Sequence, residues 1–198
     1  MAYIGSKPAN KIVTASDIED GVISTSKINY PLANFSADGG TVKLDGNYPT
    51  GTDNVALGNT ALDSVEAGGL RNTAIGSCAL TSHTTGNSNT AVGKGALADN
   101  TTGASNTAVG VSSLTNNIGS SSNTAIGNNA LFTNTSGTTN STLGTDSLFS
   151  NTTGSCNVSV GSGSLYYNTT ASSNTAVGHS ASRDNTTGYF NVAVGKDA

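Results

Sequence analysis

Residues 89–105 read NTAVGKGALADNTTGAS, and the seventeen residues that follow begin with NTAVG again. The stretch contains one lysine and one aspartate, and it lacks histidine, cysteine and aromatic residues. A repeated segment with so few reactive side chains indicates a regular architecture rather than a catalytic site.

An asparagine opens every copy of this segment, and the interval to the next asparagine is 18 once and then 17 seven times. A glycine stands four residues after each asparagine, and the residue before that glycine is always Leu, Ile or Val. A leucine stands eight residues after the asparagine in the first seven copies. Nine matched copies predict a repeat architecture over residues 54–198. The nine asparagines are Asn54, Asn72, Asn89, Asn106, Asn123, Asn140, Asn157, Asn174 and Asn191.

The repeat length restricts the shape of each copy. Helical repeats need about 33 residues or more to pack two helices, so a copy of this length is too short. An extended chain of this length traces a path of at most about 56 Å, which fits a flattened coil of two short strands joined by two bends. In NTAVG, the Thr and Val side chains would share one face of a strand and Ala the other, and the glycine would allow the bend.

Stacked coils bring identical residues into register at a spacing of about 4.8 Å. The repeated asparagines would then form a ladder of side-chain amides that bond along the stacking axis. Nine coils would make a rod segment about 40 Å long. The sequence therefore predicts an all-β parallel β-solenoid, or β-roll, of nine coils.

The segments NTAVGKGAL, NTAIGNNAL and NTAVGHSAS resemble the repeats in the head domains of trimeric autotransporter adhesins. They are still more similar to the NTAVGxxAL…NTTG repeats in fibre proteins of tailed phages. The resemblance covers residues 54–198 and implies a left-handed β-roll that assembles as a homotrimer. A thin core is compatible with that assembly, because each copy offers only Val or Ile plus Leu as large apolar side chains.

Residues 1–53 contain no copy of the motif and hold 10 of the 20 charged residues of the chain. A short segment without repeats before a repetitive shaft favours an attachment module that docks on tail or capsid proteins. The alternative is a cap that only closes the first coil and shields its edge. The expected organisation is an N-terminal attachment or capping segment at 1–53, followed by a β-roll shaft at 54–198.

Composition argues against several classes of partner. The net charge is −4 and no basic stretch is interleaved with aromatic residues, which argues against binding to nucleic acid. No apolar run approaches the length that a membrane-spanning helix needs, so we expect no insertion into a membrane. The first residues lack the apolar region of a secretory signal, so we expect synthesis in a host cytoplasm and a final place on the virion.

Few residues are suited to catalysis or metal binding. Hydrolysis of a glycosidic bond needs two carboxylates about 5–9.5 Å apart, whereas Asp99 and Asp184 share a repeat position five coils apart. Asp63 and Glu66 lie closer together, in the one irregular copy. We expect no enzyme activity, catalytic residue, metal site or cofactor.

The two histidines and two cysteines occupy scattered repeat positions. His83 and His179 have no Cys or His at the spacing of metal ligands, so we expect solvated surface side chains. Cys78 and Cys156 are too far apart along the stack for a disulfide, so we expect small, buried or half-buried thiols.

Aromatic residues concentrate in the last copies. Tyr166, Tyr167, Tyr189 and Phe190 form a candidate contact patch, because aromatic side chains can stack on sugars or dock partners. The alternative is that these rings pack between subunits. Together these features favour a structural phage fibre for host attachment through a surface glycan or protein. The alternatives are a fragment of a bacterial trimeric surface adhesin and a glycan-degrading tailspike.

Overall fold

The computed structural model describes residues 53–66 and 68–198. The segment assigned to attachment or capping, 1–53, lies outside the described residues except for Asp53. We number the coils 1 to 9 from the asparagine that opens each, so that coil 1 begins at Asn54 and coil 9 at Asn191.

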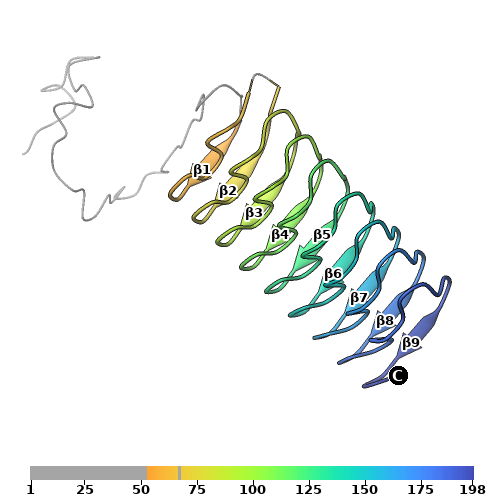
Figure 1. Cartoon of the computed structure of the whole chain (residues 1–198). Coiled ribbons are helices and arrows are strands. Elements are labelled where there is room, and N and C mark those ends of the chain that lie inside the picture. The colour runs from red at the N-terminus through yellow and green to blue at the C-terminus, as the bar shows by residue number, and fades with distance from the viewer. Residues whose placement is uncertain (1–52, 67) are drawn as a thin grey trace, which may run out of the picture. The chain divides into compact units, whose positions relative to one another are not determined.

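Each coil contributes one three-residue strand to a single parallel sheet, in which the strands follow one another in chain order (Figure 1). The register is regular: Thr90 lies opposite Thr107, and Ala91 lies opposite Ala108. The described residues contain no helix, so the predicted all-β solenoid with a 17-residue coil is confirmed. The strands are β1 (Val55–Leu57), β2 (Thr73–Ile75), β3 (Thr90–Val92), β4 (Thr107–Val109), β5 (Thr124–Ile126), β6 (Ser141–Leu143), β7 (Val158–Val160), β8 (Thr175–Val177) and β9 (Val192–Val194).

The expectation of two strands in each coil is wrong, because the second half of the coil is a series of turns. The core leucines have left-handed backbone angles, with φ between 48° and 57°, which an extended strand excludes. This half still bonds to the next coil: the N–H of Leu97 donates to the carbonyl of Ser113 at 3.0 Å. Backbone pairing between coils therefore continues beyond the strands.

Alanine and leucine form the apolar part of the solenoid interior. Ala91, in the middle of β3, and Leu97 are both fully buried, as are their counterparts in most coils. The Leu, Ile or Val that ends each strand faces outward instead, and Ile126 is 37% exposed. Each of the first seven coils thus places one leucine in the core, and only coil 1 adds a further large apolar side chain there, Val65.

A glycine at the end of each strand is required by backbone contact between coils. Gly110 has a φ of +134°, and a Cβ atom there would lie 2.3 Å from the carbonyl oxygen of Gly127. Side-chain-bearing residues rarely adopt this φ, and so short a contact would force the backbone to shift. The invariant glycine therefore allows neighbouring coils to approach at the spacing of the sheet.

Coil 1, which is one residue longer than the others, keeps the same pattern. Glu66 N–H bonds to the carbonyl of Thr84 at 2.9 Å, in register with the later coils. The side-chain amide of Asn54 reaches the carbonyl of Gly69, whereas Asn72 reaches Gly86, which is one residue nearer in sequence. The extra residue is therefore accommodated between Glu66 and Gly69.

Candidate functional site

The nine opening asparagines form a continuous ladder, which we call the first ladder. The Oδ1 of Asn89 accepts a bond from the backbone N–H of Asn106 at 3.0 Å and from its Nδ2 at 3.2 Å. The Nδ2 of Asn106 also donates to the carbonyl of Ser120 at 2.8 Å. The bond from backbone N–H to Oδ1 recurs at all eight steps between coils. Buried amides in this ladder are thus satisfied by the adjacent coil and by their own coil.

A second ladder, which was not predicted from the sequence, runs parallel to the first through the turn half of the coils. From Asn117 onward, each Nδ2 donates to the preceding asparagine's Oδ1 at 2.8–3.2 Å. Every Nδ2 of the ladder also donates to the carbonyl three residues further along its own coil at 2.9–3.0 Å. The constant spacing of 17 is the signal that could have revealed it. The members are Asn100, Asn117, Asn134, Asn151, Asn168 and Asn185.

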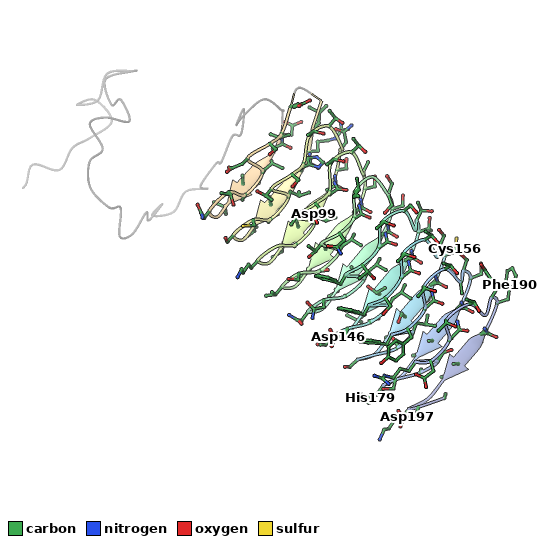
Figure 2. All side chains as sticks on the ribbon, viewed as in Figure 1. Asp99, Asp146, Cys156, His179, Phe190 and Asp197 are labelled. Atoms are coloured by element: carbon green, nitrogen blue, oxygen red, sulfur yellow. The ribbon has the colours of Figure 1, made fainter. Side chains whose placement is uncertain are left out.

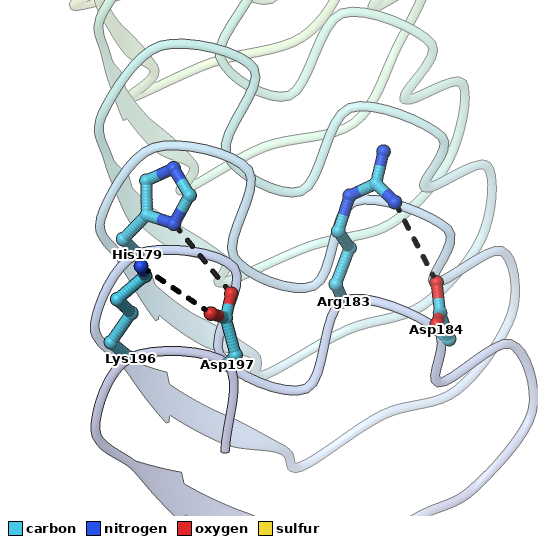
Figure 3. Close-up of polar contacts among 5 residues, drawn as sticks. All are labelled: His179, Arg183, Asp184, Lys196 and Asp197. Atoms are coloured by element: carbon cyan, nitrogen blue, oxygen red, sulfur yellow. Dashed lines mark ion pairs between the residues drawn. The ribbon is translucent and has the colours of Figure 1, made fainter.

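His83 occupies the position of this second ladder in coil 2, and the expectation of a surface histidine is wrong for it. The side chain is fully buried, its Nε2 lies 2.7 Å from the Gly86 carbonyl, and its Nδ1 lies 3.0 Å from Nδ2 of Asn100. Burial lowers the pKa of His83, and the two hydrogen bonds only partly oppose that effect. His179 is exposed, as expected, with Nδ1 3.7 Å from Asp197 (Figure 3).

Three aromatic rings stack along the axis on the outside of the turn half. The ring centroids of Phe132 and Phe149 are 5.3 Å apart, those of Phe149 and Tyr166 are 5.1 Å apart, and the planes are nearly parallel. The guanidinium of Arg183 covers the end of this stack, 5.3 Å from the centroid of Tyr166. Tyr167 meets Tyr166 edge to face. Because neighbours occupy both faces of the central ring, a sugar cannot stack on it.

The candidate contact patch divides into two pairs. Tyr166 and Tyr167 belong to the aromatic stack, whereas Tyr189 and Phe190 immediately precede the last asparagine of the first ladder. Their rings lie 6.4 Å apart, and Phe190 is 81% exposed. Figure 2 places Phe190 on the same edge of the coils as Cys156 and on the edge opposite His179. Tyr189 and Phe190, at the end of coil 8, therefore have the most free ring surface, although Tyr167 is also 41% exposed.

The acidic side chains are spread along the stack (Figure 2). Asp99 and Asp184 keep the same repeat position five coils apart, which is about 24 Å at the spacing of a sheet. Asp184 and Asp197 pair instead with Arg183 and Lys196 at 3.9 and 3.7 Å, and all four side chains are exposed (Figure 3). Within residues 53–66 and 68–198, no group of three or more His, Cys, Asp or Glu residues could hold a metal ion.

Both cysteines are free thiols. Cys78 is half-buried, as expected, whereas Cys156 is exposed. The hydroxyl of Thr60 lies 3.3 Å from the Cys78 sulfur, and this bond, with a second from Ser77, lowers the pKa of the thiol. The sequence could not show this contact, because it depends on which residue of coil 1 faces Cys78.

Comparisons with protein-family models, with curated proteins and with solved structures find no match for this chain. Among the described residues, no helix could cross a membrane. Interpretation of the coils therefore depends on their own geometry and on the resemblance of the repeat.

Proposed function

We propose that residues 54–198 form the shaft of a structural, non-enzymatic fibre on the virion of a tailed phage. The observation that carries this proposal is that the polar side chains inside each coil serve to hold the coils together. The buried asparagines of both ladders bond to adjacent coils and to the backbone of their own coil. Such an interior gives a repeat that can extend a rod, at about 4.8 Å per coil, without change of structure.

Three copies of the chain assemble around the axis of the shaft in this proposal. An exposed apolar column supports assembly, because the residues that end the strands form a stripe along the described sheet. Soluble monomers rarely expose a large continuous apolar patch, and burial against further copies would remove it from water. The most exposed members of the column are Leu57, Ile75, Ile126, Leu143, Val177 and Val194, with 37–70% of their surface accessible.

Residues 1–53 attach the fibre to tail or capsid proteins in this proposal, and the shaft projects toward the host surface. Tyr189 and Phe190 are the aromatic side chains best placed to contact a host glycan or protein, because more than half of each is exposed. The chain is made in the host cytoplasm and functions on the particle.

Immunogold electron microscopy tests the proposal, with antibodies raised against the full chain. Label on fibres of phage particles is the expected result. Label on the surface of uninfected bacteria would overturn the proposal and support the adhesin alternative. Clearing of a capsular polysaccharide by the purified chain would also overturn it, in favour of a glycan-degrading spike.

A further inference from the structure

The second ladder ends at His83, in the second of the nine coils. Asn100 donates its Nδ2 to His83, and the equivalent position in coil 1 is the hydrocarbon side chain of Val65. Both Val65 and His83 are buried. The ladder of amides therefore passes from asparagine to imidazole and then to an aliphatic side chain.

Backbone carbonyls fix the orientation of every amide in this ladder. Nδ2 of Asn100 donates to the Gly103 carbonyl at 3.0 Å, and Nδ2 of Asn117 donates to the Ser120 carbonyl at 3.0 Å. A carbonyl only accepts, so the NH₂ group must face it. A flip that exchanged the oxygen and the NH₂ group of one amide would place two oxygens together there and two NH₂ groups together at the next step.

The same logic fixes the tautomer of His83. Nε2 must carry a hydrogen, because it faces the carbonyl of Gly86 at 2.7 Å. Nδ1 must be the bare acceptor, because the NH₂ group of Asn100 points at it from 3.0 Å. The ladder thus selects a neutral imidazole with a single hydrogen on Nε2.

At the end of the ladder, a neutral histidine leaves no hydrogen-bonding group unpaired, whereas another asparagine would. An asparagine at position 83 would donate one amide hydrogen to Gly86 and direct the other toward coil 1. The aliphatic side chain of Val65 cannot accept it. A neutral imidazole has one donor and one acceptor and leaves no surplus hydrogen.

We propose that His83 makes its end of the second ladder sensitive to acid. Protonation of the His83 imidazole opens coil 2 and breaks its hydrogen bonds with coils 1 and 3. A proton on Nδ1 would set an N–H donor against the NH₂ group of Asn100. The ladder cannot relieve this conflict by reversing, because the carbonyls hold each amide. The imidazolium must instead leave its site and reach water.

Among residues 53–66 and 68–198, no charged side chain contributes to the pKa of the imidazole by stabilising a proton on it. Its pKa is lowered by burial and raised only by its bonds to Gly86 and Asn100, with no contribution from a charged group. Ser82 and Thr84 flank it in its own coil. The titratable residues of coils 1 to 3, apart from His83, are Asp63, Glu66, Arg71, Cys78, Lys94 and Asp99, and all but Cys78 are exposed.

The sign of the pH effect follows from this lowered pKa. The unfolded or opened chain binds a proton near the ordinary pKa of about 6.5, whereas the closed coil binds it at lower pH. The stability of the closed coil is therefore full above about pH 6.5 and falls as the pH decreases toward the pKa of the closed form. In that window the opening equilibrium constant rises about tenfold per pH unit.

Amide hydrogen exchange of the full chain between pH 7.5 and 5 tests the proposal, after correction for intrinsic exchange rates. We expect little change in the opening of residues 72–100 between pH 7.5 and about 6.5, and a rise approaching tenfold per pH unit below about pH 6.5 in the wild type. The exposed-histidine variant His179→Asn is the matched control and should behave as the wild type. Equal acid dependence in wild type and His83→Asn would overturn the proposal.

A second measurement keeps the test independent of any folding defect. The His83→Asn variant leaves one amide hydrogen without an acceptor, so we expect more opening than in the wild type at pH 7.5 but little further change at pH 5. Adding Val65→Asn supplies that acceptor and should restore protection.

In ¹⁵N NMR spectra of the wild type, His83 should show the neutral Nε2–H tautomer at pH 6.5. An imidazolium signal from a protected coil at this pH would contradict the proposal.

Discussion

The strand half and the turn half of each coil differ in how strictly their sequence is repeated. The strand half keeps asparagine at its start and glycine at its end in all nine coils. The turn half accepts an extra residue in coil 1, exchanges asparagine for His83 and Val65, and replaces a closing glycine by Ser120 and Ala171. Both halves contain a ladder of buried amides, so the difference lies in what each ladder bonds to.

Between coils, the first ladder bonds to the backbone N–H as well as to the side chain of the next asparagine, whereas the second ladder bonds to the next side chain alone. Loss of a first-ladder asparagine leaves a backbone N–H without its acceptor. Loss of a second-ladder asparagine removes a partner from an amide that keeps another bond in its own coil. The strand half therefore sets the register of the stack, and the turn half has more freedom to vary.

The two halves should differ most in the stability lost when a glycine is replaced by alanine. Gly127→Ala would place a Cβ atom 2.3 Å from the Gly144 carbonyl oxygen, at a φ of +139°. Strain and overpacking together should lower the free energy of unfolding by about 3 kcal/mol or more. Denaturation with guanidinium chloride measures this change.

Gly154→Ala in the turn half is the matched comparison. A Cβ atom there would lie 2.2 Å from the carbonyl oxygen of Ala171, so the coils must shift there too, but the backbone has no positive φ. Ala171 occupies the same position one coil later, and its carbonyl still accepts bonds from Asn157 and Asn168. We expect a loss of about 1 kcal/mol, because this column already accommodates one alanine. Equal losses for the two glycines would contradict the distinction between the halves.

The two ladders should differ by a smaller amount. Asn157→Ala deprives the backbone N–H of Asn174 of its acceptor, so we expect a loss of about 2–3 kcal/mol. Asn151→Ala removes one of two bonds from the amide of Asn168, and the loss should be about 1 kcal/mol. Thermal unfolding of both variants measures the difference. A larger loss for Asn151→Ala would reverse the assignment of the register to the first ladder.

The aromatic stack on the outside should contribute less than the buried ladder of the strand half. Phe149→Ala removes two stacked contacts from half-buried rings, and we expect a loss of about 1 kcal/mol. Phe149→Leu is the control, because it keeps apolar volume without a ring. Equal unfolding temperatures for wild type and Phe149→Ala would show that the stack adds nothing.

The smallest effect should come from the exposed ion pairs. Asp184→Asn removes a carboxylate 3.9 Å from Arg183, and both side chains are largely in water. The expected change is below about 0.5 kcal/mol, and it should vanish at high salt concentration. A change above about 1 kcal/mol would mean that this pair supports the turn half more than its exposure indicates.

The sequence was sufficient to predict the fold because a spacing of 17 is kept in seven of the eight intervals between asparagines. Coil number, parallel stacking and the position of the asparagines all follow from columns such as Asn89, Asn106 and Asn123. Strand content was harder to predict, since the left-handed φ of Leu97 and its equivalents depends on how the turn packs. Composition gives no sign of that conformation, because leucine rarely adopts it.

The second ladder and the buried position of His83 were harder to predict from the sequence. Asn100 and its equivalents recur every 17 residues, but the sequence does not show that this column of polar side chains faces the interior of the coils. His83 could be recognised as a member of that column only by subtracting 17 from the number of Asn100. The outward direction of Ile126 and its equivalents, on which the trimer proposal depends, also required the structure, because both Ala and Ile suit a core.

We propose, as the central point, that the repeated buried residues hold the coils together in a rod. The outward apolar column then joins three copies of the chain. Light scattering of the full chain after size-exclusion chromatography tests it most directly. We expect a mass of three chains of 19.5 kDa each. A mass of one chain, unchanged over a hundredfold range of concentration, would contradict the claim.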